Sequence, residues 1–220
     1  MTTPRRGPGR PRKADAGDTK ADLLNAALRL FARNGYAGTS IRSIAREVGL
    51  SESVLYAHFA GKQAIFDAVL STLGPNTSLG EAAQNAGVDD DPPRYLRELV
   101  RVSLDEWERE DALLLISVMA RDGLLHSPAL HDAVAAMRSR VRDLFDHWIT
   151  AGLIPADRAA ADDLAMSFTG FIGLTRILHL HADASDQDRA QARADIRAHT
   201  ETFIRLVFRG QGPVTHETRT

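Results

Sequence analysis

The region from residue 40 to residue 59 constrains the fold most strongly, because its pattern predicts two short helices joined by a tight turn. Ser40 suits the N-cap of the first helix, and Gly49 suits the turn that ends it. Ser51 can cap the second helix, which we expect to span residues 51–59. The buried side of the first helix would consist of Ile41, Ile44, Ala45 and Val48. Two helices joined in this way form a helix-turn-helix motif.

Helical patterns also occupy most of the remaining chain. A helix is expected to begin at Thr19, its N-cap, and to end at Gly35. Its apolar stripe has the spacing i, i+3, i+4, i+7 and consists of Leu24, Ala27, Leu28 and Phe31. Further helices are predicted over 62–73, 94–110, 112–125, 128–151, 158–182 and 186–209. No stretch alternates with period two, so the predicted fold class is all-α.

The pattern divides the chain into an N-terminal three-helix domain with a linking helix and a second helical domain. The predicted parts are a disordered basic arm (1–17), a helix-turn-helix domain (18–73), a loop (74–93), a second helical domain (94–210) and a flexible tail (211–220).

Charge is distributed unevenly between these parts. Residues 1–72 hold 11 Lys and Arg against 6 Asp and Glu, whereas the rest of the chain holds 16 against 23. A basic head on an acidic body predicts that the head alone meets a polyanion.

The absence of cysteine excludes disulfide and thiolate sites. The longest apolar run (166–180) is too short to cross a bilayer and contains Arg176, so we expect a cytoplasmic protein without a membrane partner.

The second helix of the motif leaves polar and aromatic residues for its outer face: Glu52, Ser53, Tyr56 and His58. A helix fits the major groove of DNA, where side chains reach the base edges. Two simpler interpretations stay open at this point. Ser51 can serve as an N-cap alone, and Tyr56 and His58 can pack against Phe59 and Phe31.

Residues 31–70 resemble the DNA-binding domain of the TetR family of bacterial transcriptional repressors. The segments that carry the resemblance are "NGYAGTS", "IRSIAREVGLS" and "LYAHFAGK". The resemblance covers some 50 of the 220 residues. The rest of the chain is similar to the family in length and helical pattern only.

The resemblance implies a role for each residue of a DNA interface. Ser40 and Arg42 would contact the DNA backbone or a nearby base. Glu52, Ser53 and Val54 would face bases, with Ser51 beside them. Tyr56 and His58 would hold phosphates, as would Lys62 together with the amides at the start of its helix. Ala57 departs from the family pattern, since many relatives carry a larger residue there, so a contact is expected to be missing.

The basic arm contains "RRGPGRPRK", which is similar to an AT-hook. In that interpretation Arg10 and Arg12 enter a narrow A·T minor groove. A tail that only adds solubility explains the same composition, and the sequence does not decide between the two.

One recognition helix reads too little DNA to be selective, so a homodimer on a palindrome is expected. The helix over 158–182 is apolar nearly all round and should be buried on two sides. The resemblance implies dimerisation through the last two long helices. The candidate interface residues are Leu164, Phe168, Phe171, Thr175, Leu178, Phe203 and Val207. An internal core is the alternative.

The resemblance also implies a pocket for a small hydrophobic effector in the second domain. The candidate lining residues are Trp107, Met119, Arg121, His126, Phe145, Trp148 and Phe168. For each of them a place in the core is the simpler alternative.

Metal and catalytic patterns are weak. His126 and His131 are five residues apart and do not share a helical face, and no nucleophile motif or phosphate loop is present. We therefore expect no cofactor, no metal and no enzyme activity. The sequence predicts a homodimeric repressor that a small molecule releases from its operator. The alternatives are a DNA-binding protein without a small-molecule ligand, structural or controlled by a protein partner, and an enzyme with a DNA-binding head.

Overall fold

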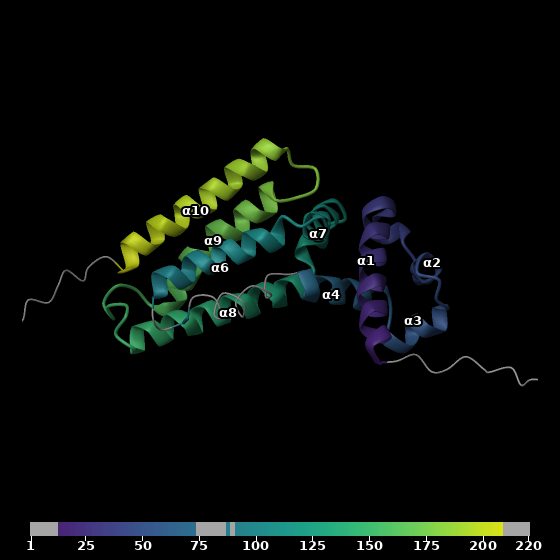
Figure 1. Ribbon diagram of the computed structural model, residues 1–220, viewed down its shortest axis with the longest axis horizontal. Helices are drawn as coiled ribbons and strands as arrows, with labels where there is room; N and C mark the ends of the chain where they lie inside the picture. The colour runs from purple at the N-terminus through teal and green to yellow at the C-terminus, as the bar shows by residue number, and fades with distance from the viewer. Residues whose placement is uncertain (1–12, 74–86, 89–90, 209–220) are drawn as a thin grey trace, which may run out of the picture. The chain divides into compact units, whose positions relative to one another are not determined.

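The computed structural model describes residues 13–73, 87–88 and 91–208, with side chains from Lys20 onward. Every regular element among these residues is a helix, which confirms the predicted all-α class (Figure 1). The chain divides into two compact units, Met1–Val69 and Leu70–Thr220. The division lies inside helix α4 (Lys62–Leu73), four residues before the boundary expected at 73.

In the N-terminal unit, α4 is preceded by α1 (Lys13–Gly38), α2 (Ile41–Glu47) and α3 (Glu52–His58). Helix α1 begins at Lys13, so the prediction that it starts with a cap at Thr19 is wrong. Lysine and alanine in 13–18 are good helix formers and allow the helix to extend past that residue. The predicted break at Gly35 is confirmed, since its φ of 79° and ψ of 158° suit only glycine.

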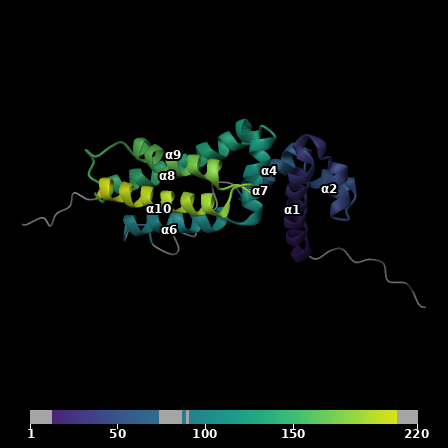
Figure 2. The ribbon, with the colours of Figure 1, turned by 90° about the horizontal axis from the view of Figure 1, so that it is seen from above.

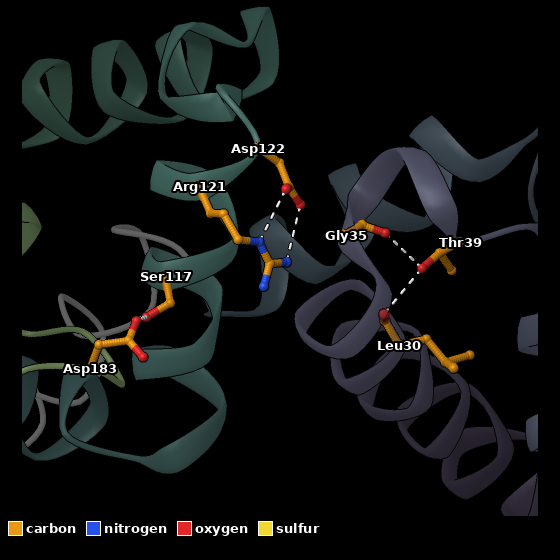
Figure 3. Close-up of polar contacts among 7 residues, drawn as sticks. All are labelled: Leu30, Gly35, Thr39, Ser117, Arg121, Asp122 and Asp183. Atoms are coloured by element: carbon orange, nitrogen blue, oxygen red, sulfur yellow. Dashed lines mark hydrogen bonds and ion pairs between the residues drawn. The ribbon is translucent and has the colours of Figure 1, made fainter.

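Thr39 fixes the chain where it leaves α1 and enters α2. Its side chain is buried, and its Oγ1 lies 2.8 Å from the carbonyl oxygen of Gly35 and 3.1 Å from that of Leu30 (Figure 3). Carbonyls at the C-terminal end of a helix lack partners within the helix, and the hydroxyl can donate to one of them. This contact positions the start of α2.

The core of the N-terminal unit joins all of its helices. Its fully buried large side chains are Leu28, Phe31, Ile44, Leu55, Ile65 and Phe66. Helix α3 contributes only Leu55 to this set, supported by the buried Phe59 just after its end. The rest of α3 is therefore available to solvent.

The second unit contains α6 (Pro92–Trp107), α7 (Glu110–Arg121), the short helix η1 (Leu124–His126), α8 (Pro128–Thr150), α9 (Ala161–His179) and α10 (Asp186–Phe208). Helices α6, α8, α9 and α10 lie side by side as a bundle, with α7 at one end (Figures 1 and 2). The bounds agree with the predicted segments to within about four residues. Gly123 and Gly152, with φ of 71° and 72°, stand where two of the predicted breaks were placed.

The core of this bundle is aromatic. Phe145 and Trp148 of α8 are fully buried, and the Phe145 ring packs against Phe168 of α9 and Phe203 of α10. Trp148 Nε1 donates to the carbonyl oxygen of Val88, 2.9 Å away. Arg97 of α6 pairs with Glu201 of α10, and Arg193 of α10 pairs with Glu108, the residue after the end of α6. In the described part of the chain, no helix combines the length and the apolar character that crossing a membrane requires.

Candidate nucleic-acid interface and ligand cavity

Local contacts fix both the start of α2 and the turn between α2 and α3. Ser40 Oγ accepts a hydrogen bond from Ser43 N at 3.1 Å, and Ser43 Oγ accepts one from Ser40 N at 3.0 Å. This reciprocal capping satisfies two amides at the start of α2. Gly49 has a φ of 69°, and Leu50 N then donates to the carbonyl oxygen of Ala45 at 2.9 Å. Glycine adopts that φ without strain, which sets the angle between the two helices.

Helix α3 presents almost its whole surface to solvent. Leu55 is its only buried residue, whereas Glu52, Ser53, Val54, Tyr56, Ala57 and His58 are exposed. Tyr56 is 57% exposed, so the interpretation in which Tyr56 and His58 pack into the core is not supported.

Ser51 occupies the N-cap position of α3, but its side chain makes no capping hydrogen bond. Its Oγ instead lies 2.8 Å from Ser53 Oγ, and both side chains are exposed. A cap alone therefore does not account for the hydroxyl of Ser51. The two hydroxyls form one polar patch at the start of α3.

The acidic side chain on α3 has a basic neighbour on α2. Arg42 Nε lies 3.7 Å from Glu52 Oε1, and the Arg42 side chain is 85% exposed. A pair this long and this exposed is weak. The guanidinium stays accessible to a phosphate, and it offsets the repulsion that Glu52 alone would exert on DNA.

Lys62 ties the start of α4 to the end of α1. Its Nζ donates to the carbonyl oxygen of Tyr36 at 2.6 Å and lies 4.4 Å from the centroid of the Tyr36 ring. Burial raises the pKa of Tyr36, and the charge of Asp67 raises it further. Tyr36 therefore stays a neutral phenol, and the Lys62 ammonium lies over an uncharged ring. The ammonium carries three N–H groups, so a contact with a phosphate is compatible with this position.

A cavity of about 370 Å³ lies in the second unit, and its walls come mainly from α6, α7, α8 and α9. Most lining side chains are apolar, and three of the residues predicted to line a pocket do so: Trp107, Met119 and Phe168. Such dimensions and lining are typical of sites for small organic ligands.

The other four predicted lining residues do not belong to the wall of this cavity. Phe145 and Trp148 belong to the aromatic core and do not reach the cavity. Arg121 Nε donates to Asp122 Oδ1 at 3.2 Å, away from the cavity (Figure 3). His126 lies in η1 and does not line the cavity either.

Ser117 Oγ donates to Asp183 Oδ2 at 3.1 Å and connects α7 with the turn before α10 (Figure 3).

Sequence reasoning missed Arg176 as a lining residue. It lies on α9 in the cavity wall, 7% exposed. A signal was present, because Arg176 is the one charged residue in the apolar run 166–180.

The predicted dimer residues divide into two groups. Phe171 and Leu178 are exposed, as an interface requires. The other five are buried within their own chain: Leu164, Phe168, Thr175, Phe203 and Val207. Two further leucines of these helices are exposed, Leu174 of α9 and Leu206 of α10. We call these four residues the outer face of α9 and α10.

The comparison with known families decides the identity of the N-terminal unit. Residues 23–69, which include α2, α3 and most of α4, match the family described as "Bacterial regulatory proteins, tetR family". The N-terminal unit is a DNA-binding domain of the TetR family. The chain is a DNA-binding transcriptional regulator of the helix-turn-helix type, in a family of regulators rather than enzymes.

Relatives of this chain extend the likeness beyond that domain. The HTH-type transcriptional regulator AcrR of Shigella flexneri is 27% identical over 67% of this chain and 72% of its own. The probable acrEF/envCD operon repressor of Escherichia coli K12 is 30% identical over 47% of this chain and 49% of its own. A TetR-family transcriptional regulator from Mesorhizobium loti MAFF303099 has the same fold, with a TM-score of 0.65 at 20% identity. That alignment covers 88% of this chain and 98% of the other.

Two predicted contacts of the regulator fall outside the part that the structure describes. Arg10 and Arg12 precede the first described residue, Lys13, so their entry into a minor groove stays a prediction. Within the described ranges, no three histidine, aspartate or glutamate side chains gather as a metal site would require.

Proposed function

We propose that this regulator binds a palindromic operator as a homodimer, represses transcription there, and leaves the DNA when a small apolar molecule occupies its cavity. The observation that carries the proposal is the surface of α3. Its polar and aromatic side chains are exposed around a single buried leucine, Leu55. A short helix fixed in this way can enter a major groove without losing its place in the fold.

The exposed residues suggest a division of roles along α3. Glu52, Ser53 and Val54 occupy its first turn and would face base edges, with Glu52 accepting from a cytosine amino group. Tyr56 and His58 would donate to phosphates. Ser40, Arg42 and Ser51 flank the helix pair and would contact the backbone of the DNA.

Lys62 takes a second role in this scheme. Because its Nζ already binds the carbonyl oxygen of Tyr36, it orients the start of α4 as well as offering charge to a phosphate. Its loss should therefore affect both the stability of the N-terminal unit and DNA affinity.

Dimerisation would use the outer face of α9 and α10. Leu206 is 67% exposed and Leu174 is 58% exposed, although both are leucines on long helices. A cluster of exposed large apolar residues marks an interaction surface. A second copy of the chain is the natural occupant, because a palindrome needs two recognition helices about one helical turn (~34 Å) apart.

The cavity supports the effector. At about 370 Å³ it lies within the range of ~300–1,000 Å³ that is typical of small-ligand sites. One similar protein is named an operon repressor, which supports repression as the direction of control.

The proposal can be tested with the full chain in two stages. An operator is first selected from a random duplex library, and the winning sequence should be a palindrome. A thermal-shift screen of small apolar compounds then identifies stabilising molecules, which are added to the protein–operator complex. A stabilising compound that releases the DNA supports the proposal. Operator binding that no compound in a broad library weakens would favour the regulator without a small-molecule ligand.

A further inference from the structure

Two buried nitrogen atoms in the cavity wall have no hydrogen-bond acceptor in the described part of the chain. They are Nε1 of Trp107, at the end of α6, and Nε of Arg176, on α9. The guanidinium carbon of Arg176 lies 4.5 Å from the centroid of the Trp107 ring, so the two side chains are neighbours. Buried donors of this kind normally have partners, and an unmet donor is costly.

Arg176 is a buried cation without a carboxylate partner. Its Nη2 donates to the carbonyl oxygen of Leu73 at 3.2 Å, but no carboxylate of the described residues forms an ion pair with it. Burial lowers the pKa of Arg176 to about 10, and the charge of Glu106 offsets part of this effect. The guanidinium stays protonated at neutral pH, and the site would be stabilised by an anion.

No other side chain of the described cavity wall is a buried cation without an ion pair. Arg138, the other arginine that lines the cavity, is paired with Asp162 at 2.5 Å and is partly exposed. The Thr169 hydroxyl donates to the carbonyl oxygen of Ala165 at 2.7 Å. The remaining walls are apolar apart from Ser103. The cavity thus has one strongly cationic point within a largely apolar enclosure.

We propose that the ligand of this cavity is an organic acid, whose carboxylate binds Arg176 and Trp107 Nε1 and whose apolar body fills the space between α6, α7, α8 and α9. This inference rests on the proposed function in one respect, that the cavity holds the effector. A carboxylate suits the site because its two oxygens only accept hydrogen bonds. Each oxygen can accept one from Arg176 Nε or from Trp107 Nε1.

The inference is tested with matched acid and alcohol probes on the full chain. One pair is linear, decanoate and decan-1-ol, and one is aromatic, 2-naphthylacetate and 2-(2-naphthyl)ethanol. Isothermal titration calorimetry at neutral pH should show that the acid of at least one pair binds about tenfold or more tightly than its alcohol. Arg176→Gln should remove that preference, and Trp107→Phe should weaken the acid several-fold while keeping the ring.

Arg193→Gln is the matched control, because it removes an arginine of the same unit that lies outside the cavity wall and is paired with Glu108 at 2.7 Å. It should leave the preference for the acid unchanged. Melting curves of the three variants show whether each is folded, and Trp107→Phe keeps the test decisive if Arg176→Gln does not fold. Equal binding of acid and alcohol, or no binding by any of the four probes, would overturn the inference.

Operator release measured on the same samples separates the two proposals. Release by an alcohol that binds as tightly as its acid would support an effector cavity and overturn the organic acid. Tight binding by the acid, lost in Arg176→Gln, without release of DNA would support the acid site and contradict the proposed control of DNA binding.

Discussion

Arg176 Nη2 donates a hydrogen bond to the carbonyl oxygen of Leu73, 3.2 Å away, and so joins the cavity wall to the last residue of α4. The same helix begins at Lys62, in the DNA-binding unit. The bond satisfies one of the carbonyls that a helix leaves open at its C-terminal end. The guanidinium that makes this bond is buried and forms no ion pair with the described residues, although the charge of Glu106 favours its protonated form.

This arrangement predicts that Arg176→Met stabilises the ligand-free protein. The variant loses one hydrogen bond and the contact with Trp107, but it also removes an unpaired buried cation, and we expect a gain of about 1 kcal/mol in the free energy of unfolding. Burial lowers the pKa of Arg176 to about 10 in the folded chain, so the cost of the charge is fully present below pH 10 and fades only above it. The gain should therefore be constant between about pH 6 and 9 in urea titrations.

Arg193→Met provides the comparison, because Arg193 Nε is paired with Glu108 Oε1 at 2.7 Å. In that variant the free energy of unfolding should fall or stay unchanged. A loss of more than about 1 kcal/mol in Arg176→Met would show that its bond to Leu73 outweighs the cost of burying the charge.

The surface of α3 predicts two kinds of DNA-binding variant. Tyr56→Phe removes one phosphate donor and should weaken binding to all duplexes about equally, by several-fold. Val54→Ala should instead change the preferred base at one operator position, because Val54 is proposed to face the major groove. Anisotropy titrations against a panel of single-base operator variants distinguish the two patterns. Ala135→Ser, at an exposed position of α8 outside the cavity wall, should change neither. A uniform loss in Val54→Ala would contradict its role in base recognition.

The turn before α3 predicts a difference between two glycines. A Cβ at Gly49 or at Gly61 would meet no atom within 4 Å, but only Gly49 of the two has a positive φ, at 69°. Gly49→Ala should therefore lower the free energy of unfolding by about 1 kcal/mol, and Gly61→Ala should leave it nearly unchanged. Thermal melts of the two variants measure the difference. Equal effects would mean that the backbone conformation of Gly49 is not what the turn requires.

The helix-turn-helix could be predicted because its signals are local. The Ser40 cap, Gly49 and the apolar spacing of α2 each act within a few residues, and the structure has them as expected. Helix α9 could not be oriented in the same way. It is apolar nearly all round, so periodicity does not tell the side that holds Leu164 and Phe168 from the side that exposes Leu178.

The cavity illustrates the same limit. Phe145 and Phe168 are both buried phenylalanines, and only packing shows that one belongs solely to the core while the other also lines the cavity. Arg176 indicates the cavity more clearly, because a charged residue inside an apolar helix requires a polar partner or a ligand in any fold.

The outer face of α9 and α10 predicts that a charge there prevents dimerisation. Leu178→Asp should raise the dimer dissociation constant at least tenfold, because the aspartate would be buried without a partner. Light scattering coupled to gel filtration measures the molar mass over a dilution series. Ala135→Asp introduces the same charge on the exposed part of α8, outside the cavity wall, and should leave the mass unchanged. An unaltered dimer in Leu178→Asp would place the interface elsewhere.

We propose that two copies of α3, related by symmetry, bind two half-sites of one operator. The mass of the complex tests this, measured with the selected palindrome and with a duplex that keeps one half-site only. We expect two chains on the palindrome and much weaker binding to the half-site duplex. A single chain bound with the same affinity to both duplexes would contradict it.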